Sequence, residues 1–310
     1  MWKVQLFKLN YDEAEPKAVE EVVRSGWITM GEKTKEFESR FAEFLGGDAK
    51  VAAVSNGTAA LHLALLALGI GPGDEVIIPS LTFVADINTV LLVGAKPVLA
   101  DCRSETDWNM DPADIERKIT PNTKAVMIVH YAGFPCDMDA IGDICKRHNL
   151  KLIEDCAHAP GARYKGKPVG TFGDIGCFSF FTNKNLSMGE GGAVTTTSAE
   201  MDQEMRYVRA HGMTALTLDR HKGRAISYDV MRPGLNYRID EMRAAIGLAQ
   251  LEKLPDAHRC RKSIVERYIA AFKGIEGLVI PFIDQADTEP VYHIFPTMLP
   301  EGMDRMQVIE

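Results

Sequence analysis

From about residue 50 onward, short apolar runs alternate with amphipathic segments, and this alternation limits most strongly what the chain can fold into. The runs VAAVS, EVIIPS and AVMIVHY are followed by helical patterns over residues 58–68, 84–93 and 137–148, respectively. Strands that alternate with helices predict a mostly parallel sheet with helices on both faces. We therefore expect a three-layer α/β/α fold.

The later segments predict further strands, a long helix and a second domain. GCFSFF and GAVTTT are rich in Phe, Val and Thr, so two more strands are expected with a glycine-containing loop between them. A helix is expected over residues 199–211, and a longer one from Ile239 to about Phe272, broken or bent at Pro255. Residues 214–233 lack clear periodicity and predict a long exposed loop that reaches another subunit. GLVIP, from Gly277, is expected to be the first strand of a smaller domain.

The length of 310 residues predicts about two domains, at roughly 150 residues each. We expect a large cofactor-binding domain with an N-terminal arm over residues 1–250, and a small C-terminal domain over residues 251–310. Acidic residues outnumber basic ones, 43 to 35, and the net charge of −8 creates no broad attraction for nucleic acids or anionic membranes.

Neither a membrane span nor a metal site is expected. The most apolar stretches are too short to cross a bilayer, and the first residues lack the pattern of a signal peptide. We therefore expect a cytoplasmic protein. The six cysteines are scattered without any C-x-x-C pair, which favours buried reduced thiols over zinc or iron–sulfur ligands.

Residues 55–60, with the sequence SNGTAA, lie between an expected strand and a helix rich in Ala and Leu. Gly57 would permit the close approach of a ligand, and Thr58 can cap the helix or donate its hydroxyl. Free amides at a helix start favour a phosphate. Taken alone, a capped helix without a ligand is the more common explanation of the same residues.

Asp155 and His158 follow the apolar run KLIE, so both are expected at the carboxyl end of a strand, where doubly wound sheets bind ligands. A buried carboxylate needs a cationic or hydrogen-bonding partner, and a protonated heteroaromatic nitrogen is such a partner. The alternative is that Glu154 or Asp155 pairs with a nearby arginine or caps the next turn. For His158, a structural role is more common than a functional one.

Lys184 stands between an expected strand and a glycine-rich loop, with aromatic and amide neighbours. Desolvation there would lower the pKa of its amine and make it a Schiff-base nucleophile, although most lysines are solvated. Taken together, a phosphate cradle, a carboxylate at a strand end and a lysine are the parts that a pyridoxal phosphate enzyme needs.

These residues lie in motifs that run in order along nearly the whole chain: SNGTAALHLAL, PSLTFVADINTV, IEDCAHAPGARYKGKPVGTFGDIGCFSFF, TNKNLSMGEGGAV and GLNYRIDEMRAAIGLAQL. The set resembles the sugar aminotransferases of the DegT/DnrJ/EryC1/StrS family, which have the aspartate aminotransferase fold, fold type I of pyridoxal phosphate enzymes. The resemblance implies a large domain of that type and a small α+β domain that is shortened, because family members continue past the position of Glu310.

The resemblance also implies roles for residues around a pyridoxal 5'-phosphate cofactor. Lys184 would form the internal aldimine, Asp155 would pair with the pyridine nitrogen, and His158 would lie near the phenolic oxygen of the ring. Phe83 occupies the position of the aromatic residue that stacks on the ring, where an offset aromatic pair adds about 1 kcal/mol.

The phosphate-binding positions of the family match Gly57, Thr58 and Ser179. Asn236 matches an asparagine that reaches the phosphate from a neighbouring subunit, which implies a homodimer with a shared active site.

The implied activity is transfer of an amino group from glutamate or glutamine to a nucleotide-linked 3-keto or 4-keto sugar, in amino sugar and polysaccharide biosynthesis. Relatives that dehydrate or deoxygenate sugars carry histidine in place of the lysine, and some of them hold an iron–sulfur cluster. Lys184 and the scattered cysteines therefore favour transamination. An alternative is a non-catalytic or regulatory relative that binds the cofactor and the sugar nucleotide only. A nicotinamide enzyme is disfavoured, since no G-x-G-x-x-G follows the first expected strand.

Overall fold

The computed structural model describes residues 5–46, 48–215, 217–223, 225–283 and 285–309, and seven of its strands form one central sheet. These strands are β1 (Lys50–Val54), β2 (Glu75–Pro79), β3 (Lys96–Ala100), β6 (Thr123–Val129), β7 (Lys151–Asp155), β10 (Ile175–Ser179) and β11 (Gly192–Thr196). Their order across the sheet is β1-β11-β10-β7-β6-β2-β3. Strand β11 is antiparallel to both of its neighbours and the other pairs are parallel, so the predicted mostly parallel sheet is confirmed.

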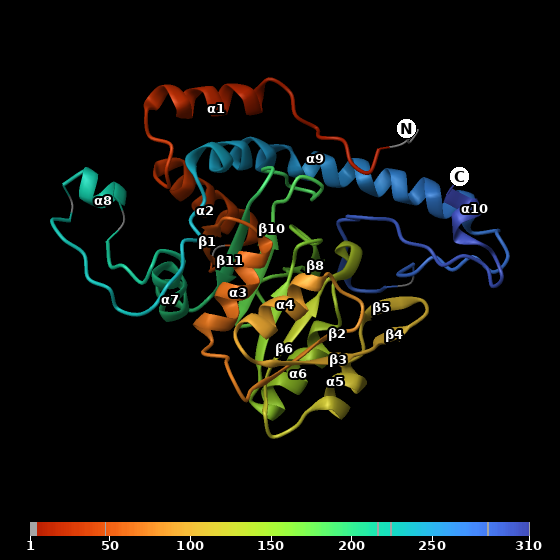
Figure 1. Cartoon of the computed structure of the whole chain (residues 1–310). Helices are drawn as coiled ribbons and strands as arrows, with labels where there is room; N and C mark the ends of the chain where they lie inside the picture. Colours follow the sequence, from red (N-terminus) through yellow and green to blue (C-terminus); the bar gives the residue numbers. More distant parts are fainter. Residues whose placement is uncertain (1–4, 47, 216, 224, 284, 310) are drawn as a thin grey trace.

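Helices cover both faces of this sheet, as Figure 1 shows. One face is packed against α3 (Gly57–Ala67), α4 (Val84–Leu92) and α7 (Ala199–Arg209). The other is packed against α2 (Glu32–Leu45), α5 (Pro112–Lys118), α6 (Met138–His148) and α9 (Glu241–Phe272). Alternation along each strand produces the two cores: in β2, Val76 and Ile78 face the first set of helices and Ile77 faces the second. The expected three layers are therefore present.

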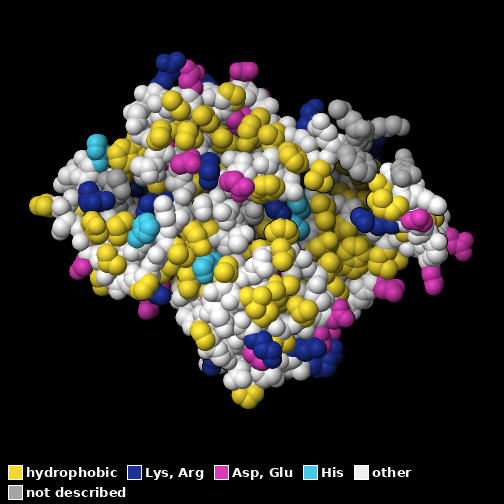
Figure 2. All heavy atoms as spheres, in the orientation of Figure 1, with side chains coloured by type: hydrophobic (Ala, Val, Ile, Leu, Met, Phe, Trp, Pro, Cys, Tyr) yellow, Lys and Arg dark blue, Asp and Glu magenta, His cyan; other side chains and the backbone are white. Residues whose placement is uncertain are grey.

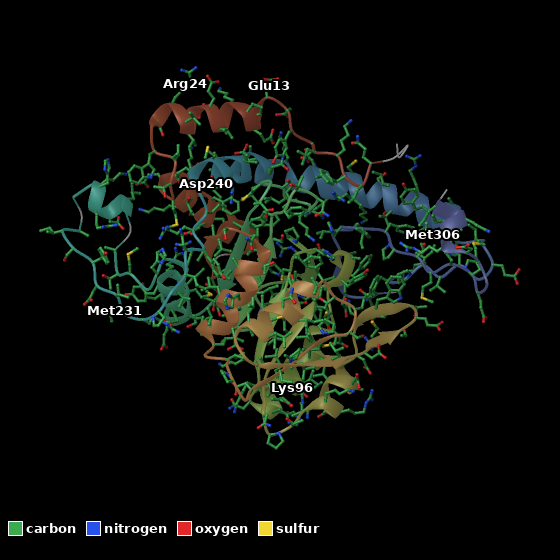
Figure 3. The ribbon with its side chains drawn as sticks, viewed as in Figure 1. Glu13, Arg24, Lys96, Met231, Asp240 and Met306 are labelled. Carbon is green, nitrogen blue, oxygen red and sulfur yellow. The ribbon has the colours of Figure 1, made fainter. Side chains whose placement is uncertain are left out.

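Local sequence sets where several of these helices begin. The residue directly before each of α3, α5, α6, α7 and α9 has a side-chain oxygen that accepts a hydrogen bond from a backbone amide of the first turn. These residues are, in the same order, Asn56, Asp111, Asp137, Ser198 and Asp240. Asp240 is labelled at the start of α9 in Figure 3. Such caps satisfy amides that have no partner within the helix, each typically contributing about 1 kcal/mol.

Shorter elements surround this body: α1 (Ala14–Ser25), β4 (Cys102–Ser104), β5 (Asp107–Met110), the 3-10 turn η1 (Tyr131–Gly133), β8 (Arg163–Tyr164), β9 (Lys167–Pro168), α8 (Thr217–His221), β12 (Thr288–Glu289) and α10 (Arg305–Ile309). Helix α1 lies along α9 (Figure 1), where Gln250 Nε2 and Lys253 Nζ each donate to Glu15 at 2.7 Å. Glu15 therefore ties the N-terminal arm to α9.

Three details differ from the sequence predictions. Of the predicted break or bend of α9 at Pro255, the break is absent, because the helix continues through that residue as one helix of 32 residues. GLVIP is not a strand: within the described residues it makes only an isolated bridge, between Val279 and Met298. The expected loop over residues 214–233 carries the short helix α8, and Figure 3 labels Met231 on the same loop. GLVIP is not a strand because, among the described residues, it has no neighbouring strand to pair with, and an apolar run without one cannot extend a sheet.

The segment after α9 packs on the large body. The Phe282 ring stacks on Phe134 with ring centroids 4.5 Å apart, and the amides of Val291 and His293 donate to the carbonyls of Gly133 and Ala132. The predicted boundary between residues 250 and 251 falls inside α9, and the division into two domains stays a prediction.

Lys and Arg side chains are interspersed with Asp, Glu and apolar side chains on the face that Figure 2 shows, so no single sign of charge dominates that face. Among the described residues, no helix combines the length and apolar character that crossing a membrane requires.

Candidate functional site

The carboxyl ends of β7 and β10 bring together most of the residues that the sequence singled out. These two strands are parallel neighbours, and Cys177 of β10 is paired with Asp155, the last residue of β7. Ser179 ends β10, and Lys184 lies on the loop that leads from there to β11. The start of α3 adjoins Ser179, since a Cβ on Gly57 would lie 2.8 Å from the Ser179 Cβ. The predicted site is therefore assembled at one edge of the sheet.

Lys184 has a partly buried side chain, and none of the described residues forms a hydrogen bond or an ion pair with its amine. Burial lowers the pKa of the Lys184 amine from its ordinary value, and the negative charge of Asp155 opposes that shift. A lysine with a lowered pKa exists more often as the free amine, which is the nucleophilic form. The sequence prediction of a desolvated lysine is supported on this point.

Asp155 is buried at the end of β7, where its Oδ1 accepts the Ala157 amide at 2.8 Å. Burial raises the pKa of its carboxyl, while the Ala157 amide and the positive charge of Lys184 act in the opposite direction. Asp155 therefore does cap the next turn, as the structural alternative proposed. The cap engages one oxygen and leaves the carboxyl group close to Lys184.

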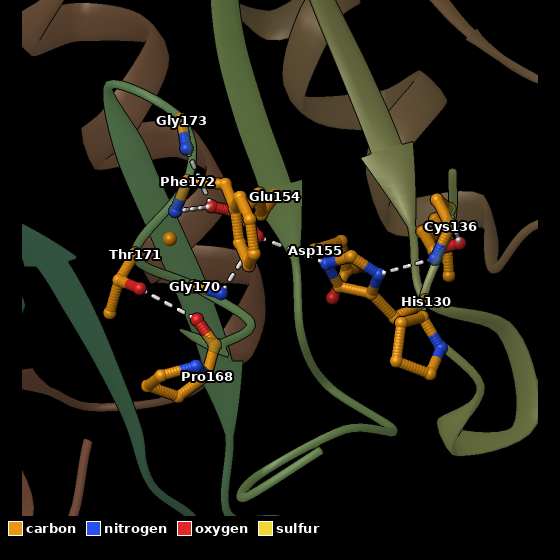
Figure 4. Close-up of polar contacts among 12 residues, drawn as sticks. His130, Cys136, Glu154, Asp155, Pro168, Gly170, Thr171, Phe172 and Gly173 are labelled. Atoms are coloured by element: carbon orange, nitrogen blue, oxygen red, sulfur yellow. Dashed lines mark hydrogen bonds and ion pairs between the residues drawn. The ribbon is translucent and has the colours of Figure 1, made fainter. Parts of the chain in front are cut away.

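Glu154, the preceding residue, points to the other side of the sheet and has a purely structural environment. Figure 4 shows its carboxylate accepting the amides of Gly170, Phe172 and Gly173, each at 2.7 Å, together with a contact to His130 Nε2 at 3.1 Å. Burial raises the pKa of Glu154, but His130 and these amides together hold it below its ordinary value. Within the described part of the chain, neither acidic residue pairs with an arginine.

His130, Glu154 and Cys156 place one potential metal ligand each within 4.8 Å of one another, and all three are buried. His130 Nδ1 accepts the Cys136 amide, so Nε2 carries the proton that Glu154 accepts. Burial raises the pKa of the Cys156 thiol well above its usual range. Both imidazole nitrogens and the carboxylate are already engaged, so these residues fit a hydrogen-bonded core better than a metal.

His158 lies beside the candidate site with its ring against His293, the centroids being 4.3 Å apart. Its Nδ1 accepts the Ala132 amide at 3.3 Å, which leaves the proton on Nε2. Burial, aided by the charge of Lys184, lowers the pKa of His158 to about 3. The ring is therefore neutral at neutral pH and can donate from Nε2. His293 was not predicted as a site residue, because 135 positions of chain separate it from His158.

The start of α3 offers free donors. Asn56, rather than Thr58, is the cap, since its side chain accepts the Ala59 amide at 2.8 Å. The structure assigns no acceptor among its described residues to the amides of Gly57 and Thr58. Gly57 is required by the close approach of Ser179, which the sequence does not reveal. Two free amides and the Ser179 hydroxyl at a helix start fit a phosphate.

Two further predicted residues lie at the surface. Phe83 directly precedes α4, and 71% of its surface is exposed. Asn236 is exposed on the segment before α9, where its backbone bridges to Ala210. Its predicted action on a second subunit stays a prediction.

Asp86 is a buried acidic residue that the sequence did not single out. It lies in the first turn of α4, and its carboxyl interacts with Asp155. A sequence signal exists, an acidic residue within an otherwise apolar helix pattern, but that signal alone does not identify the partner.

The residues present fit pyridoxal phosphate. The free amides of α3 suit its phosphate, Asp155 suits its ring nitrogen, and Lys184 suits its aldehyde. All three groups lie at the same edge of the sheet.

Comparison with known proteins gives a consistent picture. A model of the DegT/DnrJ/EryC1/StrS aminotransferase family matches residues 10–310. The chain is 42% identical over 299 residues to the spore coat polysaccharide biosynthesis protein SpsC of Bacillus subtilis, a match that spans 95% of this chain and 76% of that protein. It is 44% identical over 293 residues to GDP-perosamine synthase of Escherichia coli O157:H7, spanning 94% and 76% respectively.

Solved structures agree. The aminotransferase TlmJ of Streptoalloteichus hindustanus superposes with a TM-score of 0.87 at 35% identity, over 94% of this chain and 77% of that one. A Streptococcus pneumoniae protein solved in PLP and PMP forms matches with a TM-score of 0.89 at 32% identity, over 97% of this chain and 79% of that one.

Proposed function

We propose a specific reaction for this chain, which belongs to the DegT/DnrJ/EryC1/StrS aminotransferase family and is a pyridoxal phosphate-dependent sugar aminotransferase. In this reaction, an amino group moves from glutamate or glutamine to a nucleotide-linked 3-keto or 4-keto sugar. The name of the related GDP-perosamine synthase contains a nucleotide-linked sugar, which supports that substrate class. The name of SpsC supports a place in polysaccharide biosynthesis.

The observation that carries the proposal is the environment of Lys184. Its amine lies near Asp155 without a hydrogen-bonding partner among the described residues, and burial lowers its pKa. We propose that the Lys184 amine would hold the cofactor at its aldehyde and, once freed by the amino donor, would carry the proton at the substrate α-carbon. The bound cofactor supplies an electron sink for the developing carbanion.

The other side chains hold and orient the cofactor in this proposal. Gly57 and Thr58 donate their free amides, and Ser179 its hydroxyl, to the phosphate. Asp155 keeps the ring nitrogen protonated, and His158 donates from Nε2 toward the phenolic oxygen of the ring.

Phe83 covers a face of the ring in the same proposal. Its exposed position directly before α4 leaves the aromatic surface free for such stacking.

A homodimer in the cytoplasm completes the proposal, with Asn236 of each chain serving the site of the other. Support comes from the loop that carries α8, where Ile226, Tyr228, Val230 and Met231 expose large apolar side chains. Several exposed large apolar side chains on one loop are typical of a protein interface. Analytical ultracentrifugation tests the dimer.

The deciding experiment incubates the protein with pyridoxal phosphate, glutamate or glutamine, and a panel of nucleotide-linked 3-keto and 4-keto sugars. Mass spectrometry should detect the amino sugar product, and Lys184→Ala should form it roughly 10²–10⁴-fold more slowly. Lys146→Ala, which changes an exposed lysine on α6, is the matched control and should retain activity. Binding of cofactor and sugar nucleotide without amine transfer would favour the non-catalytic alternative instead.

A further inference from the structure

Asp86 is unusually deeply buried for an acidic residue. It is fully buried in the first turn of α4. The Thr82 hydroxyl donates to its Oδ2, while Oδ1 is buried and has no hydrogen-bond donor among the described residues. An ionised carboxylate with one buried and unsatisfied oxygen is costly, whereas a protonated carboxyl is not.

The missing partner of Asp86 is a second carboxyl group. Asp86 and Asp155 interact through their side chains, from α4 and from the end of β7. Carboxylate oxygens only accept hydrogen bonds, so two carboxyl groups can bond to each other only when one of them holds a proton. Two buried carboxyl groups that hydrogen-bond to each other in this way hold one proton between them.

The surroundings decide which of the two keeps that proton. Asp155 accepts the Ala157 amide at 2.8 Å and faces the positive charge of Lys184, and both favour its ionised form. Among the described residues, the Thr82 hydroxyl is the only hydrogen-bond donor to Asp86. Burial and the charge of Asp155 raise the pKa of the Asp86 carboxyl well above its ordinary value.

Other titratable groups act mainly on the Asp155 side. His130, which directly follows β6, also interacts with Asp155, and a positive charge on its ring would favour the ionised form of Asp155. Cys177 of β10 faces both carboxyl groups, and burial raises the pKa of its thiol well above the usual range, so that it adds no negative charge. These groups leave Asp86 as the member of the pair that holds the proton.

We propose that the Asp86 carboxyl is protonated at neutral pH and donates a hydrogen bond to Asp155, so that Asp86 is a positioning residue for the carboxylate that faces the cofactor ring. The inference rests on the proposed function for the role of Asp155, while the position of the proton is a property of the chain itself. Asp86 does not serve α4 as a cap, because Phe83 precedes the helix without any side-chain cap bond.

The first test is infrared spectroscopy of the full chain, with and without pyridoxal phosphate, at neutral pH. The difference between the parent and Asp86→Asn should contain the carbonyl band of a protonated carboxylic acid, which shifts in deuterated water. Asp139→Asn is the matched control: a hydrogen bond from Lys165 lowers the pKa of the exposed Asp139, so this difference should contain no such band. Absence of the band for Asp86 overturns the inference.

The second test measures cofactor affinity against pH by fluorescence titration. Asp86→Asn keeps the shape, the neutrality and a donor, so the dissociation constant should stay within about twofold of the parent at neutral pH. Asp86→Ala removes the donor and should weaken binding about tenfold or more. At alkaline pH the parent should lose affinity as Asp86 ionises, whereas Asp86→Asn should not. If Asp86→Asn and Asp86→Ala lose the same cofactor affinity at neutral pH, Asp86 does not act as a neutral hydrogen-bond donor.

The two hypotheses fail separately. An acid band from Asp86 in a chain that transfers no amine leaves the proton assignment standing and removes the proposed function. Amine transfer in a chain without that band supports the proposed function and removes the proton assignment. If Asp86→Ala does not fold, the infrared comparison with Asp86→Asn still decides the question.

Discussion

The two acidic residues at the end of β7 are neighbours in sequence and opposites in environment. Glu154 faces one side of the sheet, where three backbone amides and His130 satisfy its carboxylate. Asp155 faces the other side, among Asp86 and Lys184, where the charges are only partly compensated. Complete hydrogen bonding is typical of a group that stabilises a fold, while incomplete compensation leaves a group free to act on a ligand.

The largest effect expected from this comparison is on the Asp155 side. Lys184→Ala should reduce transamination by roughly 10²–10⁴-fold, because the amine that moves the proton is lost. Thermal unfolding should change little, since no described residue pairs with that amine. Rates and unfolding midpoints are measured on the same preparations. Full activity in Lys184→Ala, with Lys146→Ala as control, would remove the lysine from the chemistry.

The next effect is on the Glu154 side. Glu154→Ala should lower the free energy of unfolding by about 3–5 kcal/mol, because three amides and His130 lose their buried acceptor. Chemical denaturation measures the loss. Glu21→Ala, an exposed position on α1, should change it by no more than about 0.5 kcal/mol. Equal stability of the two variants contradicts a structural role for Glu154.

A third prediction concerns the contact between α3 and β10. Gly57→Ala should destabilise the fold by about 1–3 kcal/mol, because the new Cβ would lie 2.8 Å from the Ser179 Cβ. Gly142→Ala is the matched control, since a Cβ there would meet nothing within 4 Å. That control lies inside α6 and should add about 0.5–1 kcal/mol of stability. If both variants gain stability in thermal unfolding, the close approach is not as described.

A smaller effect is expected at the exposed edge of the Asp155 side. Phe83→Leu should weaken cofactor binding by about 0.5–1.5 kcal/mol, the value of an aromatic stack. Its exposure of 71% means that the free energy of unfolding should hardly change. Leu92→Ala, at another exposed position of α4, should leave cofactor affinity unaltered in the same titration. Unchanged affinity in Phe83→Leu argues against stacking.

The smallest expected effect is on how steeply the free energy of unfolding depends on pH. Since His130 and the backbone amides hold the pKa of Glu154 below its ordinary value, this residue stabilises the fold above the unfolded pKa of about 4.3. That contribution is lost as the pH falls through the lower pKa of the folded state. Glu154→Gln should therefore show a shallower decline of stability in acid. An unchanged slope in denaturation at several acidic pH values would contradict the shift.

The sequence predicts the layers well because periodicity is a local property. Alternating runs define the strands, and a buried strand such as β2 must present successive residues to opposite cores. The resemblance to a known family then points to Lys184, Asp155 and Ser179, and strand ends of a parallel sheet meet at one edge.

What escaped prediction depends on tertiary contacts between distant positions. Asp86 and Asp155 come together only because α4 packs near the end of β7. The order of the strands in the sheet likewise cannot be predicted from any local sequence pattern. The close approach of Gly57 to Ser179 has the same origin. The prediction of a strand at GLVIP was wrong because an apolar run forms a strand only where a neighbouring strand is present.

The most direct test of the central claim is to trap the bond between Lys184 and the cofactor. The protein is incubated with pyridoxal phosphate, reduced with borohydride and digested, and the peptides are sequenced by mass spectrometry. The mass of the reduced cofactor should be found on Lys184 and should vanish in Lys184→Ala. The same mass on another lysine, or on none, contradicts the account.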